Sequence, residues 1–165
     1  MSGRLQGRVA VVTGAGQGVG EGIARRFAAE GAHVVIAARR AATGEPVAAS
    51  IREAGGSAVC IETDVAQRAS VESCVAATVE RFGALHVMVH NAFGGAAANR
   101  VEATDLERHW HMMSRTGAWG SLFCAQAAYP HLAAVGSAGR LLMVTSPAGI
   151  EGSANLPLYA AVKAA

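Results

Sequence analysis

The sequence of 165 residues is poor in charged and in aromatic side chains, which make up 16% and 5% of it. It has no apolar run of membrane-spanning length, and its first apolar run leads directly into a glycine-rich turn, unlike a signal peptide. Its 14 Lys and Arg residues are scattered, so they form no stripe that could follow a phosphate backbone. These features argue against a membrane or nucleic-acid partner, and we expect a soluble, cytoplasmic protein.

Cysteine pairs and metal-ligand clusters are also missing. The three cysteines, Cys60, Cys74 and Cys124, are odd in number and far apart, and each lies in an apolar run. This pattern predicts reduced, buried thiols rather than a disulfide framework. His109 and His111 are two residues apart, so on a helix they point to different sides and cannot share a metal ion. We therefore expect no metal site.

What the sequence does contain is 52% apolar residues, arranged in short runs that alternate with longer stretches of helical spacing. The runs at residues 8–13, 32–38, 57–63, 85–90 and 140–145 are nearly continuous, as strands covered on both faces must be. Helical spacing occurs at residues 18–30, 45–54, 66–82 and 104–134, and a further helix begins near Pro157. The alternation predicts an α/β fold: a doubly wound, Rossmann-like parallel sheet of about five strands, with residues 1–165 as one domain.

A glycine-rich segment, TGAGQGVG at residues 13–20, lies between the first predicted strand and the first predicted helix. Glycines there permit a tight turn, close approach of the backbone to a pyrophosphate, and close packing of the helix on the strand. The helix N-terminus adds N–H groups that bind anions. The alternative is a glycine-rich turn without a ligand, but the position of the segment favours a nucleotide site.

The spacing T-G-x-x-x-G-x-G resembles the short-chain dehydrogenase/reductase family, and the resemblance extends over essentially the whole chain. It implies cofactor contacts from the loop, from the pair after the third strand and from the pair after the fourth: Gly14, Gly16, Gln17, Gly18, Val19, Gly20, Asp64, Val65, Asn91 and Ala92. On its own, Asp64 is equally consistent with an N-cap of the helix that follows.

Tyr159 and Lys163 are four residues apart, so on a helix they share one face. An ammonium beside a phenol favours the phenolate, which suits proton exchange with an alcohol oxygen while a hydride moves at the carbon. Ser146 follows the predicted strand 140–145, at the distance before Tyr159 where the family has its substrate-orienting serine. The resemblance therefore implies that Ser146, Tyr159 and Lys163 are catalytic and that the last two also contact the cofactor. Ser146 alone is also consistent with a turn before Pro147.

Three positions depart from the family pattern. His90 and Phe93 flank the matching Asn-Ala pair where the family has Asn and Gly. Gly117 stands where the family has an Asn that helps to hold a water near the lysine. Phe93 puts a large ring beside the expected cofactor path, and Gly117 removes part of the proton relay. We hypothesise that Ser114 or Ser121, one helical turn away, holds a substitute water.

The second predicted strand ends in Ala-Ala-Arg-Arg, without a carboxylate that could bind the ribose hydroxyls of NAD. Arg39 can instead pair with a 2′-phosphate through two hydrogen bonds, which favours NADP(H) over NAD(H). Gln17 counts against this preference, because NADP-dependent members of the family often have a second basic residue there. Arg39 and Arg40 are also consistent with a solvated pair at a helix start.

The resemblance implies an NAD(P)-dependent enzyme that interconverts a small-molecule alcohol with its ketone or aldehyde. It also implies two further strands after Lys163, so we expect a C-terminally incomplete domain in which residues 140–145 form an open edge. In the family the helices that correspond to residues 104–134 and to the Tyr-Lys segment commonly build subunit interfaces, which implies a homodimer or homotetramer. The alternative function is a non-catalytic dinucleotide-binding or sensing domain, which Phe93, Gly117 and the early end of the chain favour.

Overall fold

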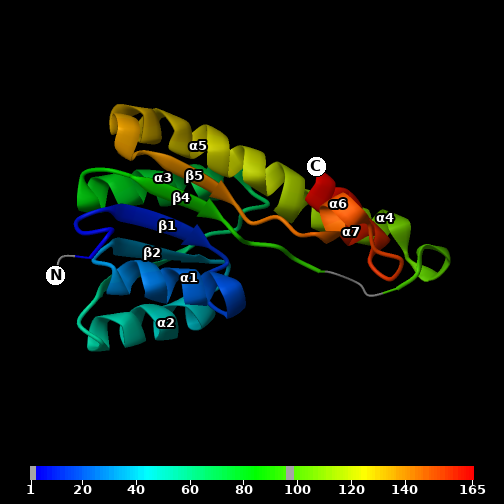
Figure 1. The fold of residues 1–165 in the computed structure, drawn as a ribbon, viewed down its shortest axis with the longest axis horizontal. Helices are drawn as coiled ribbons and strands as arrows, with labels where there is room; N and C mark the ends of the chain where they lie inside the picture. Colours follow the sequence, from blue (N-terminus) through cyan, green and yellow to red (C-terminus); the bar gives the residue numbers. More distant parts are fainter. Residues whose placement is uncertain (1–2, 96–98) are drawn as a thin grey trace.

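Five parallel strands form the centre of the structure, a computed structural model that describes residues 3–95 and 99–165 (Figure 1). The strands are β1 Val9–Thr13, β2 His33–Ala38, β3 Ser57–Glu62, β4 Val87–His90 and β5 Arg140–Met143. They lie in the order β3-β2-β1-β4-β5, and every neighbouring pair is parallel. The predicted doubly wound α/β fold is therefore confirmed.

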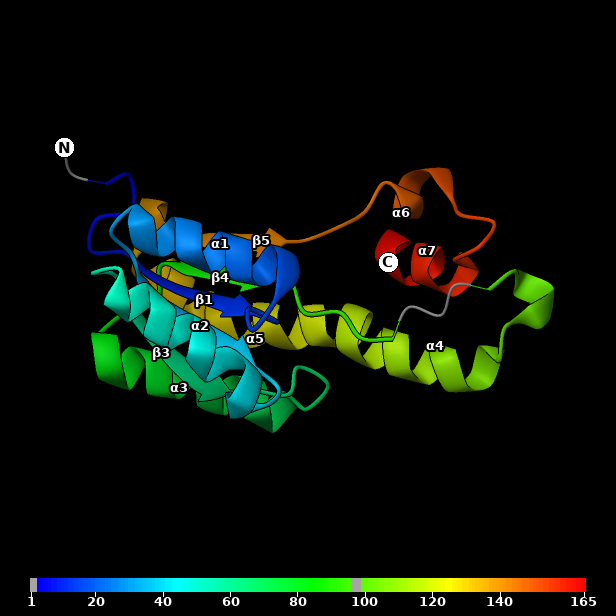
Figure 2. The ribbon, with the colours of Figure 1, turned by 90° about the horizontal axis from the view of Figure 1, so that it is seen from below.

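Helices cover both faces of the sheet (Figure 1). Two of them, α1 Gly18–Ala29 and α2 Ala41–Glu53, cover one face, and α3 Arg68–Phe82 and α5 Gly120–Ala134 cover the other. The other segments are α4 Leu106–Ser114, a π-helix at Arg115–Trp119, α6 Ala148–Glu151, α7 Pro157–Ala164, and 3-10 turns at Val101–Ala103 and Gly136–Ala138. Both α6 and α7 lie beyond the carboxyl ends of the strands, where α7 packs between α4 and α6 (Figure 2).

The core has two apolar layers, because successive side chains of a strand point to opposite faces of the sheet. Ala10, Val12 and Ile36 pack with residues of α1 and α2. Val11 and Val35 pack with residues of α3 and α5. All five residues of β1 are buried, which explains why the central strands have continuous apolar sequences.

The environments of β5 and of two of the three cysteines agree with the prediction from the sequence. All four residues of β5 are exposed, since the strand lies at an edge of the sheet. The three cysteines are free thiols; Cys74 and Cys124 are buried, whereas Cys60 is half-buried. Within residues 3–95 and 99–165, no helix has the length and apolar character needed to cross a membrane.

Two helices differ from the prediction. The helix expected at residue 45 begins at Ala41, and Gly44 within it is a point of close packing on the sheet. A Cβ on Gly44 would lie 2.5 Å from Cys60 Sγ on the sheet. The long helix predicted at residues 104–134 consists of α4, the π-helix and α5, preceded by an extended residue, Thr104. A π-helix widens the helical turn and thereby changes which side chains share a face.

The direction in which the chain crosses the sheet changes at β1. From β1 the chain continues to β2 and β3 on one side, while β4 and β5 lie on the other side. The carboxyl ends of β1 and β4 are therefore neighbours, with Val12 paired to Val89, and the segments that follow them diverge. In open α/β sheets, ligands bind at such a point.

His90 is a buried polar residue at the carboxyl end of β4, with 5% of its surface exposed. Its Nδ1 lies 3.4 Å from Thr13 Oγ1 and 3.6 Å from Cys124 Sγ. Burial, followed by the charge of Lys163, lowers the pKa of His90 from 6.5 to about 4. Burial also raises the pKa of the Cys124 thiol to about 12. At neutral pH the cluster is therefore uncharged, as its buried position requires.

We predict that His90 makes the fold sensitive to acid. Its pKa is lower in the folded chain, so the unfolded chain takes up a proton first, and stability is lost as the pH falls from about 6.5 to about 4. Between pH 7 and about pH 4.5, the wild type should lose about 2 kcal/mol more than a His90→Asn variant. Urea unfolding at each pH measures the difference, with His111→Asn, an exposed site on α4, as the control. Equal pH slopes in wild type and His90→Asn would contradict the prediction.

Candidate functional site

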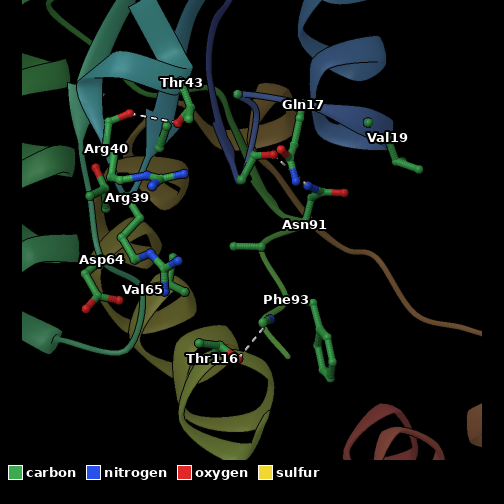
Figure 3. Close-up of a pocket in the computed structure, with 17 residues that line it drawn as sticks. Gln17, Val19, Arg39, Arg40, Thr43, Asp64, Val65, Asn91, Phe93 and Thr116 are labelled. Carbon is green, nitrogen blue, oxygen red and sulfur yellow. Dashed lines mark hydrogen bonds between the residues drawn. The ribbon is translucent and has the colours of Figure 1, made fainter. Parts of the chain in front are cut away.

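The carboxyl ends of the central strands border a cavity of about 360 Å³ (Figure 3). This volume is typical of a small-molecule site. The walls come from the glycine loop, from the segments after β2, β3 and β4, and from the π-helix. The lining residues are Gly14, Gly16, Gln17, Gly18, Val19, Ala38, Arg39, Arg40, Thr43, Thr63, Asp64, Val65, Asn91, Ala92, Phe93, Gly94 and Thr116.

The glycine loop leaves the N-terminus of α1 open. Gly14 and Gly18 have φ angles of +66° and +59°, which other residues rarely adopt. Gln17 precedes α1, but its side chain makes no capping hydrogen bond. Gly18 lines the cavity, and a Cβ there would meet no described atom within 4 Å. Uncapped N–H groups beside open space fit the pyrophosphate of a dinucleotide.

Thr13 and Asn91 join the loops that follow β1 and β4. The backbone N–H groups of Asn91 and Ala92 both donate to Thr13 Oγ1, at 3.0 and 3.1 Å. Asn91 Nδ2 donates to the carbonyl oxygen of Thr13 at 2.9 Å. Gly20, the predicted loop residue that does not line the cavity, lies behind this contact, because a Cβ there would be 2.5 Å from Asn91 Nδ2. These bonds make Asn91 and Ala92 part of the cavity wall.

Asp64 and Val65 follow β3 and line the cavity together. Asp64 Oδ1 accepts a hydrogen bond from Ala66 N at 3.0 Å, and α3 begins only after Gln67. The interpretation of Asp64 as the N-cap of that helix is therefore wrong, because its carboxylate closes a local turn instead. Val65 is buried beside it and offers an apolar contact.

Arg39 and Arg40 are exposed at the end of β2, across the cavity from the glycine loop (Figure 3). Neither forms an ion pair with another described residue. Glu62, at the end of the adjacent strand β3, accepts a hydrogen bond from Ala41 N at 3.1 Å and does not line the cavity. The β2 end of the cavity is therefore cationic.

Ser146, Tyr159 and Lys163 do not line this cavity. Lys163 Nζ lies 5.9 Å from the centre of the Tyr159 ring and donates to the carbonyl oxygen of Val144 at 2.6 Å. Burial lowers the pKa of Lys163. Ser146 Oγ accepts from Ala148 N at 3.3 Å, as in the turn that the sequence allows, and within the described ranges it has no hydrogen bond to the other two. The structure thus brings Tyr159 and Lys163 together and leaves Ser146 in a separate contact.

Phe93 contacts both the cavity and the Tyr-Lys pair. It lines the cavity, and its ring packs edge-on against Tyr159 with 5.1 Å between ring centres. Lys163 Nζ lies 4.8 Å from the centre of the same ring. Figure 3 shows the ring turned away from Arg39 and Asp64. Phe93, which the sequence predicts beside the cofactor path, therefore connects the cavity to the Tyr-Lys pair.

The two serines proposed to hold a water form hydrogen bonds with backbone carbonyl groups of their own helical segment. Ser114 Oγ donates to the carbonyl oxygen of Trp110 at 2.6 Å. Ser121 Oγ donates to that of Ala118 at 2.8 Å. Each hydroxyl retains its lone pairs as acceptors, so the water remains a hypothesis.

The sequence did not predict three threonines that line the cavity: Thr43, Thr63 and Thr116. Thr116 Oγ1 accepts a hydrogen bond from Gly94 N at 3.2 Å, which ties the loop after β4 to the π-helix. No spacing in the sequence indicates this contact, because it depends on how the long helix crosses the strand ends. Thr43 lies in the part of α2 that precedes the predicted helix.

Comparison with known proteins gives matches over nearly the whole chain. The family model for short chain dehydrogenases matches residues 8–165. Sorbitol dehydrogenase from Cereibacter sphaeroides is 34% identical over 162 residues, which cover 98% of this chain and 61% of that protein. Galactitol 2-dehydrogenase from Agrobacterium fabrum is 35% identical over 164 residues, again 98% of this chain and 61% of the relative.

A solved structure agrees with these matches. It is the crystal structure of a 3-ketoacyl-(acyl-carrier-protein) reductase from Brucella melitensis complexed with NADH, with a TM-score of 0.88 and 34% identity. The match covers 97% of this chain and 65% of the reductase chain, so the present chain spans less than two thirds of each of these three proteins. With the fold, the glycine loop and the family match in agreement, the chain belongs to the short chain dehydrogenase family.

Proposed function

We propose that this chain is the nucleotide-binding domain of an NAD(P)-dependent oxidoreductase that interconverts a small-molecule alcohol with its ketone or aldehyde. The observation that carries the proposal is the cavity at the carboxyl ends of β1 and β4, which combines an uncapped helix N-terminus with the cationic end of β2. The names of the relatives support it, since two are dehydrogenases of sugar alcohols. The similar reductase structure contains NADH.

The cavity residues divide by chemistry. We assign the pyrophosphate to the N–H groups of the glycine loop, the adenine to the walls after β3, and the path to the nicotinamide to the loop after β4. The residues are Gly14, Gly16, Gln17, Gly18 and Val19 for the first, Asp64 and Val65 for the second, and Asn91 and Ala92 for the third. Gly20 supports the first group from behind, by permitting the close approach of Asn91. When bound, the nicotinamide donates or accepts a hydride at the substrate carbon.

Proton transfer falls to the residues of α7 and of the segment after β5. Tyr159 exchanges the proton with the substrate oxygen. Lys163, whose ammonium lies 5.9 Å from the centre of the Tyr159 ring, also binds the cofactor ribose. Ser146 donates a hydrogen bond to the same substrate oxygen and so stabilises the charge that develops there. The contacts of Tyr159 and Lys163 with Phe93, which lines the cavity, support this assignment for those two residues.

NADP(H) is the preferred cofactor in this proposal. Arg39 and Arg40 line the cavity without an ion-pair partner in the described part of the chain, so both guanidinium groups are available to a 2′-phosphate. Glu62 does not line the cavity, so its carboxylate does not occupy the place of a ribose ligand.

A non-catalytic dinucleotide-binding domain is the second candidate. It is favoured by the position of Ser146, Tyr159 and Lys163 outside the cavity. It is also favoured by the hydrogen bond from Lys163 to the carbonyl oxygen of Val144, which occupies one of the three donor positions of the ammonium. Both candidates bind a nucleotide, and they differ in whether Tyr159 matters for turnover.

We propose that the protein is a homodimer or homotetramer. Large apolar side chains are exposed along α4, the π-helix and α5, in contrast to the buried Met113 of the same segment. They are Trp110, Met112, Trp119 and Leu122, which are 44%, 40%, 55% and 56% exposed. Contiguous exposed apolar surface marks association sites.

The Tyr159→Phe variant tests the catalytic proposal. The ring is retained but the transferable proton is lost, so we expect turnover of polyols with NAD(P)⁺ to fall by about 10²–10⁴-fold. The dissociation constant of NADPH, measured by fluorescence titration, should change little. Tyr129→Phe is the matched control, because Tyr129 is exposed on α5 away from the cavity. Turnover that survives in Tyr159→Phe, or is absent from the wild type, would favour the non-catalytic domain.

The Arg39→Ala variant tests the cofactor preference. A lost hydrogen bond to a charged phosphate costs about 1.5–3 kcal/mol, so the NADPH dissociation constant should rise about 10–100-fold. The affinity for NADH should stay nearly constant, because NADH has no 2′-phosphate. Arg108→Ala, at an exposed position on α4, is the control for loss of charge. An equal loss for both cofactors would refute the preference.

The oligomer is tested by sedimentation equilibrium. We expect the wild type to associate and a Trp119→Glu variant to shift toward the monomer, because a charge in a buried apolar interface is costly. Ile150→Glu, at an exposed apolar position on α6 outside this surface, is the comparison and should leave the association unchanged. A wild type that sediments as a monomer throughout the micromolar range would overturn the proposal.

A further inference from the structure

The backbone around Phe93 is held on both sides. Before it, Ala92 N donates to Thr13 Oγ1 at 3.1 Å. After it, Gly94 N donates to Thr116 Oγ1 at 3.2 Å. With both neighbours bonded to different elements, the backbone restricts the directions in which the Phe93 ring can point.

The ring is seated on the bare backbone of Gly117 in the π-helix. A Cβ on Gly117 would lie 2.9 Å from Phe93 Cε2 and 2.5 Å from Val162 Cγ1, closer than real Cβ contacts. Any side chain at position 117 therefore collides with the Phe93 ring and with α7. The two residues that depart from the family pattern at this end of the site, Phe93 and Gly117, thus fit each other.

The Phe93 ring also packs against the Tyr-Lys pair. Lys163 Nζ lies 4.8 Å from the ring centre, within the range of a cation–π interaction, and the Tyr159 ring packs against it edge-on. Lys163 is half-buried and has no ion-pair partner among the described residues. The contacts that compensate its partial burial are therefore the carbonyl oxygen of Val144 and the aromatic rings.

We infer that Phe93 is a positioning residue: its ring, seated on Gly117, holds the Lys163 ammonium and the Tyr159 ring at the end of the nucleotide cavity. The inference rests on the function proposed above, and it assigns Phe93 a role through Lys163 rather than a contact with the reacting atoms. It also explains why Gly117 carries no side chain: the ring and α7 occupy that space.

Lys163 is the single lysine of the chain, so selective ¹³C-lysine labelling reports on this site alone. We expect the Cε resonance and its protons to be displaced upfield by the Phe93 ring current, and the displacement to vanish in Phe93→Leu. Because the ring stabilises the ammonium, the pKa of Lys163 should fall by about 0.5 or more in Phe93→Leu. Tyr159, whose ring lies near Lys163, and His90, whose pKa responds to the charge of Lys163, are both unchanged in this variant.

Two matched variants complete the measurement. Phe93→Tyr keeps an aromatic face and should restore both the upfield displacement and the pKa. Phe123→Leu removes a ring on α5 that packs under Arg68 of α3, and it should leave the Lys163 signal unchanged. A Lys163 resonance and pKa that do not respond to Phe93→Leu would overturn the inference.

The seat at Gly117 is tested separately with Gly117→Ala. One added methyl group should lower the melting temperature by about 2 °C or more and reduce the upfield displacement of Lys163. Gly22→Ala is the control, because Gly22 is also helical and a Cβ there meets no described atom within 4 Å. A Gly117→Ala variant that behaves like Gly22→Ala in both readouts would contradict the proposed seat.

These readouts do not depend on activity, so the two proposals can fail independently. If Tyr159→Phe retains turnover while Lys163 still responds to Phe93, the catalytic assignment is wrong and the positioning contact stands. If Lys163 ignores Phe93 while NADPH binds and Tyr159→Phe is inactive, the positioning role is wrong and the proposed function stands.

Discussion

The hydrogen bonds between Thr13 and Asn91 are the constraint on which the rest of the site depends. They lie where the order of the strands reverses, and they join the carboxyl end of β1 to that of β4. Because the Thr13 hydroxyl accepts from two successive N–H groups, the loop after β4 follows the glycine loop closely. Gly20 permits this approach, since a side chain there would displace the Asn91 amide. A cavity with an open helix N-terminus is the consequence.

At the end of the site near α7, close packing rather than polar contact fixes the side chains. Phe93, Gly117 and Val162 come from a loop, a π-helix and α7, and they meet at distances that leave no room for a further side chain. A π-helix has a wider turn than an α-helix, and it alters the direction of the groups around it. The large Phe93 side chain occupies the space beside position 117, where Gly117 has no side chain. The two departures from the family pattern therefore compensate each other in volume.

The pattern of apolar residues predicted the strands of the sheet correctly. It did not predict the structure where a helix packs against another element. All five strands lie within the predicted runs, and burial on both faces explains the continuous apolar sequences of β1, β2 and β4. The start of α2 was predicted four residues too late; Gly44 lies within the helix and permits close contact with Cys60. The π-helix was not predicted, since residues 104–134 have uninterrupted helical spacing. Asp64 shows the same limit, because a local pattern cannot distinguish a helix cap from an Asx turn.

The fold class, the family and the glycine loop could be predicted from the amino-acid sequence alone, as could the shared helix face of Tyr159 and Lys163. These properties depend on local periodicity and on short spacings, which the chain encodes over a few residues. Three features required the folded structure. Arg39 lies across the cavity from the glycine loop, and Thr116 joins the loop after β4 to the π-helix. The Phe93 ring lies between Gly117 and Lys163. Those contacts join residues more than twenty positions apart, and their distances follow from the packing of the helices against the sheet rather than from any pattern along the chain.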